Sequence, residues 1–155
     1  MTRKPAPPAQ APQPLTPDEE AVVRALPSLL YALPRAIDAH MAREQGMSNT
    51  EYLTLMYLSE APGRQLRMHE LAHALEMSLS GTSRIVQRME SVGYIERTQC
   101  DTDRRSWHAY LTDAGFTRLE EAWPSNLAAV RRHFLDHLKD LDLKKLAAAL
   151  RNVAS

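Results

Sequence analysis

The stretch from Ser78 to Arg88 combines short hydroxyl side chains with one glutamine and two arginines. Its polar members are Ser78, Ser80, Thr82, Ser83, Arg84, Gln87 and Arg88. A solvated helix face usually mixes glutamate with lysine, but here no acidic residue occurs until Glu90. Arginine and glutamine carry donor groups that fit base edges in the DNA major groove. The composition therefore predicts a surface that contacts bases and phosphates.

The same stretch has the pattern of a helix. The hydroxyl of Ser78 can cap it by accepting a hydrogen bond from a backbone N–H in the first turn. Gly93 stands where a helix is expected to end. An apolar face is expected to pack against the rest of the chain, and its members are Leu79, Ile85, Val86 and Met89. The polar face would then be free to enter a groove.

A β-hairpin with a basic tip is predicted to follow this helix. Residues 94–98 and 107–111 have the pattern of two short strands, and the turn between them is polar. Such a hairpin is a wing, and a wing arginine fits the narrow minor groove of A·T-rich DNA, where negative potential is concentrated.

Two motifs resemble those of the MarR family, in the family's order and spacing. The wing tip and the segment after it are similar to the family's D-R-R … L-T-x-x-G run, and they are Asp103-Arg104-Arg105 and Leu111-Thr112-Asp113-Ala114-Gly115. The predicted DNA-contacting helix, called the reading helix from here on, and the start of the strand after it are similar to the family's recognition helix and first wing strand. The matching residues are Ser78-x-Ser80-x-x-Ser83-Arg84-x-Val86-x-Arg88-Met89-Glu90, Gly93-Tyr94-Ile95 and Arg97. The resemblance covers roughly Leu15 to Val153.

This resemblance implies a mainly α protein, a winged helix-turn-helix with a small β-wing, flanked by N- and C-terminal dimerisation helices. It implies a homodimer that binds a pseudo-palindromic operator in double-stranded DNA, most often as a repressor released by a small molecule. Arg104 is then expected in the minor groove, with Asp103 as its orienting carboxylate. Arg105 is either a phosphate contact or the structural partner of an acid.

The chain before the reading helix divides into a tail and helices. Residues 1–15 are rich in Pro, Ala and Gln and are expected to be disordered. Thr16 and Glu19 form a capping box that opens a helix, and residues 16–46 are assigned to dimerisation. Pro27 and Pro34 are expected to kink or break this helix, because each removes a backbone donor.

Residues 48–112 are assigned to the DNA-binding lobe. Ser48 and Glu51 form a second capping box, residues 65–67 are expected to pair with the wing, and residues 69–76 form a short helix before the reading helix. Residues 113–155 are assigned to dimerisation. A long helix capped by Thr112 is expected to keep its apolar side as far as Leu138, and a last helix is expected to start at Asp142.

The resemblance places a ligand between the dimerisation helices and the DNA-binding lobe. The side chains expected to line such a cleft are those of His40, Tyr52, Met56 and Trp123. A Met or an aromatic residue at helical spacing is more often plain core, so both interpretations stay open for each of them. A regulator that ignores ligands, or one that responds to a metal or a thiol, is the alternative.

Composition excludes several other classes. Lys+Arg and Asp+Glu both number 19, so no global charge attracts nucleic acid. The chain has a single cysteine, Cys100, which excludes an intrachain disulfide and suggests a reducing compartment. The sequence also has no apolar run long enough to span a membrane. We therefore expect a cytoplasmic protein. His133 and His137 have a chelating spacing, but without a nearby cysteine a structural or solvated pair is favoured, and Cys100 is expected to be inert.

No cofactor or metal is expected, and no catalytic motif appears. A winged helix that only contacts proteins would have an apolar or acidic reading face, which residues 80–88 do not have.

Overall fold

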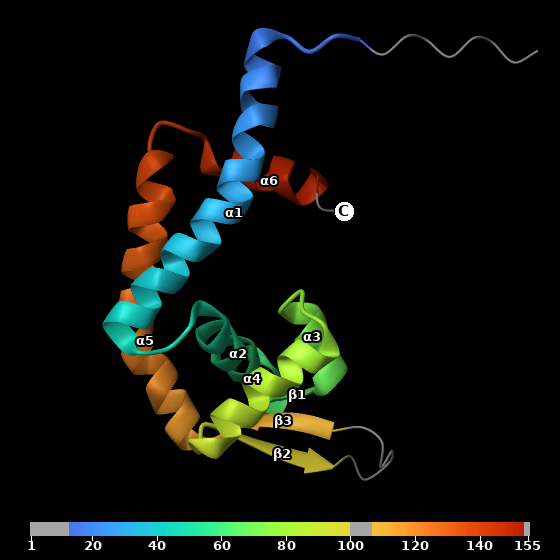
Figure 1. Ribbon diagram of the computed structural model, residues 1–155, viewed down its shortest axis with the longest axis vertical. Helices are drawn as coiled ribbons and strands as arrows, with labels where there is room; N and C mark the ends of the chain where they lie inside the picture. The colour runs from blue at the N-terminus through green and yellow to red at the C-terminus, as the bar shows by residue number, and fades with distance from the viewer. Residues whose placement is uncertain (1–12, 100–106, 154–155) are drawn as a thin grey trace, which may run out of the picture.

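The computed structural model describes residues 13–99 and 107–153, and within them the chain is mainly helical with one small sheet. The elements are α1 (Pro17–Gln45), α2 (Asn49–Glu60), β1 (Gln65–Arg67), α3 (Met68–Ala74), α4 (Leu79–Ser91), β2 (Ile95–Gln99), β3 (Trp107–Leu111), α5 (Asp113–His133) and α6 (Leu143–Val153). Figure 1 shows α1 and α5 side by side, next to a lobe formed by α2, α3, α4 and the sheet.

Both predicted capping boxes are confirmed. Thr16 Oγ1 accepts from the Glu19 backbone N–H at 3.3 Å, and the Glu19 carboxylate accepts from the Thr16 N–H at 2.7 Å. Ser48 and Glu51 repeat the arrangement at 3.1 and 2.7 Å. These local hydrogen bonds fix where α1 and α2 begin.

Of the kink or break predicted for α1, the break does not occur, whereas Figure 1 shows the helix changing direction along its length. The helix continues from Pro17 to Gln45 with Pro27 and Pro34 inside it. Each proline deprives the carbonyl four residues earlier, at Val23 and Leu30, of its N–H partner. Both of those residues are exposed, so solvent can satisfy the two carbonyls and the helix is not forced to end.

The sheet is antiparallel with the order β1-β3-β2. The predicted pairing of residues 65–67 with the returning strand of the wing is confirmed, with Leu66 opposite Ala109. Strands β2 and β3 pair from Ile95 and Leu111 outward to Gln99 and Trp107. The hairpin is therefore fastened to the lobe at the end where Ile95 and Leu111 are buried.

The core of the lobe lies between α2, α3, α4 and the sheet. Its fully buried side chains include Leu55, Leu58, Leu71, Val86, Ile95 and Leu111. Two helices from outside the lobe contribute to the same cluster, α1 through Met41 and α5 through Ala122. The reading helix is thus held on a rigid base that is continuous with α1 and α5.

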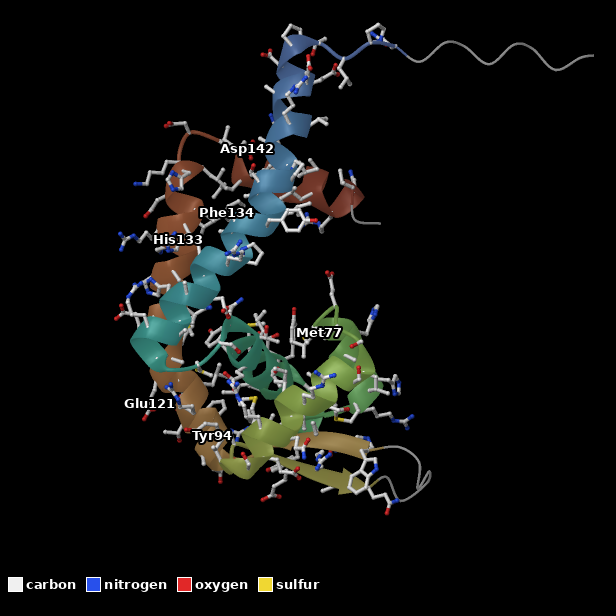
Figure 2. All side chains as sticks on the ribbon, viewed as in Figure 1. Met77, Tyr94, Glu121, His133, Phe134 and Asp142 are labelled. Atoms are coloured by element: carbon white, nitrogen blue, oxygen red, sulfur yellow. The ribbon has the colours of Figure 1, made fainter. Side chains whose placement is uncertain are left out.

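The long helix after Thr112 is shorter than predicted. It ends at His133, and Phe134 leaves helical geometry with φ −138° and ψ −68°. Figure 2 shows His133 and Phe134 at the end of α5 that lies farthest from the lobe. A 3₁₀ turn (Leu135–His137) follows. The Asp142 carboxylate then accepts the Lys145 N–H at 3.1 Å, so the last helix starts there as expected.

Within the described residues, no helix combines the length and the apolar character of a membrane span.

Candidate nucleic-acid interface

The exposed face of α4 carries most of the predicted DNA contacts. Ser78 caps the helix as expected, because its Oγ accepts the Gly81 N–H at 3.2 Å. The Ser80 hydroxyl lies 3.2 Å from the Ser78 hydroxyl. Arg84 and Gln87 are exposed and have no hydrogen-bond or ion-pair partner among the described residues. This face therefore presents free donor groups to solvent.

Two expectations for α4 are wrong. The buried positions are Thr82, Val86 and Met89, spaced by four and three residues. That spacing puts Thr82, rather than Leu79, on the packed side of the first turn. Thr82 is 0% exposed and its hydroxyl donates to the Ser78 carbonyl at 3.1 Å, so it does not reach DNA. Leu79 is 53% exposed and belongs to the outer face. Ser83 is half-buried.

Arg88 has an internal partner that the sequence does not reveal. Its Nε donates to Glu51 Oε1 at 2.6 Å, and a second guanidinium nitrogen contacts the same oxygen. Glu51 is only 6% exposed, and its other oxygen accepts the Ser48 N–H. One carboxylate therefore caps α2 and fixes α4 against it. Arg88, whose side chain is 63% exposed, positions the reading helix through this ion pair.

The wing is joined to α4 by a second ion pair. Arg97 Nε donates to Glu90 Oε2 at 2.8 Å, and the Arg97 guanidinium lies 6.0 Å from the centre of the Trp107 ring. This arrangement ties β2 to the C-terminal end of α4. The predicted wing residues Asp103, Arg104 and Arg105, and Cys100 beside them, lie outside the described residues.

The start of α5 is locked to the loop that follows α4. Thr112 Oγ1 donates to the Gly93 carbonyl at 2.7 Å and accepts the Gly115 N–H at 3.0 Å. Its backbone N–H donates to the Tyr94 carbonyl at 3.2 Å. In Figure 2, Tyr94 lies beside the end of α5 nearest the sheet. The reading helix, the wing and α5 thus meet at one hydrogen-bonded junction.

Comparison with known proteins decides the family. The MarR family pattern matches residues 45–106. Sco3205 from Streptomyces coelicolor, a MarR family transcriptional regulator solved in complex with DNA, is 35% identical, with a TM-score of 0.82 over 92% of this chain and 90% of that one. The chain belongs to the MarR family. AbsC, a second MarR family regulator from Streptomyces coelicolor, is 33% identical, with a TM-score of 0.80 over 92% of this chain and 96% of that one.

The transcriptional repressor MprA of Escherichia coli is 34% identical to this MarR regulator over 84 residues. The match covers 54% of this chain and 48% of MprA, so the chain spans about half the length of that relative. The family consists of transcriptional regulators and not of enzymes.

Three of the four predicted ligand residues of this MarR regulator lie around one hollow. Tyr52, Met56 and Trp123 line a space of about 350 Å³ between α2 and α5. Burial, and secondarily the charge of Glu60, raises the pKa of Tyr52, so its hydroxyl stays neutral. His40 does not line this hollow, because its ring packs edge-on against His133 with the ring centres 6.1 Å apart.

The structure does not gather a set of metal ligands around the histidine pair His133 and His137, within the residues it describes. His133 faces His40, and no group of three or more His, Cys, Asp or Glu side chains in residues 13–99 and 107–153 is arranged to hold a metal ion.

Replacing Arg88 with alanine is expected to lower the free energy of unfolding by about 2 kcal/mol, because Glu51 stays buried without its charged donor. Arg84→Ala is the matched control on the same helix and should leave stability nearly unchanged. Urea unfolding at a fixed protein concentration measures both. Equal losses for the two variants would refute the positioning role of Arg88.

Proposed function

We propose that this MarR regulator is a homodimeric repressor that binds a pseudo-palindromic operator and is released by a small molecule. The observation that carries the DNA-binding part is the outer face of α4, where Arg84 and Gln87 are exposed without internal partners. Sco3205, solved in complex with DNA, has the same fold at 35% identity, and the relative MprA is a repressor.

Dimerisation is supported by apolar surface on α1 and α6. The exposed apolar residues of α1 include Val22, Val23, Leu26, Leu29, Leu30 and Tyr31. Helix α6 has no buried residue, although Leu143, Leu150 and Val153 lie along it. Contiguous apolar surface of this kind usually marks a protein interface. A second copy of the chain would cover it.

A two-fold dimer would present two α4 helices to successive major grooves, about 34 Å apart along the duplex. Selection of bound sequences from a random duplex pool, at stated salt, tests this geometry. A pseudo-palindrome with half-sites about ten base pairs apart is the expected result. Enrichment of a single half-site, or no enrichment by folded dimeric protein, would count against the proposal.

Arg84→Ala is expected to weaken binding to the selected operator by about 1–3 kcal/mol, because a free guanidinium on the reading face is lost. Fluorescence anisotropy of labelled duplex measures the change. Arg131→Ala, which removes an exposed arginine from α5, is the control and should have little effect. Unchanged affinity in Arg84→Ala at physiological salt would remove this residue from the interface.

Release by a ligand is supported by the hollow between α2 and α5. It touches α2, which holds α4 through Glu51 and Arg88, and α5, which is joined to the wing at Thr112. A molecule that changes the distance between α2 and α5 would therefore displace the reading helix relative to the dimer.

A further inference from the structure

The hollow between α2 and α5 has a distinctive chemical lining. Its walls include the aromatic rings of Tyr52, Phe116 and Trp123, and its polar side chains include Glu60 and Glu120. Tyr52 is buried, whereas Trp123 is 61% exposed. The side of the hollow formed by Tyr52 is therefore enclosed by protein, and the side formed by Trp123 is open to solvent. A space of about 350 Å³ is at the small end of the range for ligand pockets.

The two glutamates lack cationic partners. Glu60 and Glu120 form no ion pair or hydrogen bond with any described residue. One arginine outside the lining contacts a wall residue, since the Arg64 guanidinium lies 4.2 Å from the centre of the Phe116 ring. Arg64 forms an ion pair with Asp113 at 3.1 Å. The lining described here includes no lysine, arginine or histidine.

The aromatic rings of the hollow, like its two carboxylates, favour a positively charged ligand. The face of an aromatic ring carries partial negative charge and attracts cations, most strongly in tryptophan. A positively charged group placed between the carboxylates and the Trp123 ring would gain from both. A negatively charged group in the same place would be repelled by Glu60, Glu120 and the ring faces.

We propose that the α2–α5 hollow binds an organic cation, a quaternary or protonated amine attached to a flat apolar body. The apolar body would lie against Met56 and Phe116, and the charged group would lie near Glu60, Glu120 and Trp123. This inference rests on the proposed function, because the cation would be the molecule that releases the operator.

Another hollow, between the lobe and the ends of α1 and α5, differs in charge. It has a volume of about 580 Å³, and its charged lining residues are Glu51, Arg88 and Arg118 from α2, α4 and α5. Both arginines are engaged, Arg88 by Glu51 and Arg118 by the side chain and carbonyl of Gln45. This hollow therefore offers no unpaired charge to a ligand, whereas the α2–α5 hollow offers two unpaired carboxylates. The sign of the ligand's charge is therefore a direct test of the α2–α5 hollow.

The test uses two probes of equal shape and opposite charge, biphenyl-4-ylmethyl-trimethylammonium and biphenyl-4-ylmethanesulfonate. Calorimetric titration of the full chain is expected to show the cation binding at least about tenfold more tightly, since both carboxylates attract the cation and repel the sulfonate. The double variant E60Q/E120Q should lose about tenfold in affinity for the cation. E121Q, at the next position of α5, is the control and should bind like the parent.

Equal or tighter binding of the sulfonate, or a double variant that binds the cation like the parent, would overturn the inference. Operator affinity is measured separately by anisotropy with and without the cation. Neither probe binding while the operator still binds would refute the cation site and leave DNA recognition standing. Cation binding lost in E60Q/E120Q, without any change in operator affinity, would uphold the site and refute only release by the ligand.

Discussion

Replacing Leu26 and Leu30 together with aspartate is expected to yield a folded monomer whose operator affinity is lower by more than about 100-fold. Both side chains are exposed, so the variant should keep the core of the lobe. Two carboxylates on the proposed interface would have to be desolvated in a dimer, which is strongly unfavourable. A monomer meets one half-site at a time and loses the advantage of a linked second contact.

The face that Leu26 and Leu30 share continues along α1 into the core. Positions 23, 26, 30, 33, 37 and 41 are spaced by three and four residues, and at the end of this row Ile37 packs against the core and Met41 is fully buried. The same side of α1 is thus covered by its own chain at one end and uncovered at the other. The uncovered end is where the proposed second copy would lie.

The matched control is the double variant A21D/S28D. Ala21 and Ser28 are exposed on the opposite side of α1, so the same two charges should leave the dimer intact. Light scattering after gel filtration gives the mass, circular dichroism reports folding, and anisotropy gives operator affinity. If the Leu26/Leu30 variant remained dimeric and bound the operator tightly, α1 would have to be removed from the interface.

Patterns confined to neighbouring residues were sufficient to predict much of this fold. The capping boxes at Thr16 and Ser48 depend on contacts three residues apart, and the structure has both. The two strands of the wing were predicted from short strand patterns on either side of a polar turn, and the structure has both strands. Such features are visible in a sequence because the interacting groups lie close together along it.

Errors arose where the environment decides between two local possibilities. Proline was expected to kink or break α1, and no break occurs, because the affected carbonyls are on an exposed stretch and the helix continues. On α4, Leu79 was expected to be buried and Thr82 to be exposed, and the structure has the reverse. Thr82 can be buried because its hydroxyl donates a hydrogen bond to the Ser78 carbonyl and so leaves no polar group unsatisfied. Composition alone does not reveal which side of a helix meets the core.

Long-range contacts between side chains were also beyond the sequence. Arg88 was predicted as a DNA contact, and its partner Glu51 lies 37 residues earlier in the chain. Tyr52, Met56 and Trp123 were correctly placed around one space, whereas His40 instead faces His133. Both outcomes depend on how α1, α2 and α5 pack together. The wing tip, with Asp103, Arg104 and Arg105, stays a prediction.

Replacing Gly115 with alanine is expected to lower the free energy of unfolding by about 3 kcal/mol, the cost of overpacking where neighbours cannot move. A Cβ built on Gly115 would lie 2.1 Å from the Tyr94 carbonyl oxygen and 2.7 Å from a Leu111 methyl group. The first of these is backbone, and it already accepts the Thr112 N–H, so it cannot withdraw without breaking that bond. This contact explains the glycine of the L-T-x-x-G motif.

Ala114→Ser is the control, since Ala114 is exposed one position earlier on α5 and should tolerate the change within about 0.5 kcal/mol. Unfolding in urea at one protein concentration compares the two variants with the parent. The clash lies at the junction of α4, β2 and α5, so Gly115→Ala should also weaken operator binding although it lies far from the reading face. A variant as stable as the parent would mean that α5 can move away from Tyr94, and the junction would then not hold the wing and the reading helix in register.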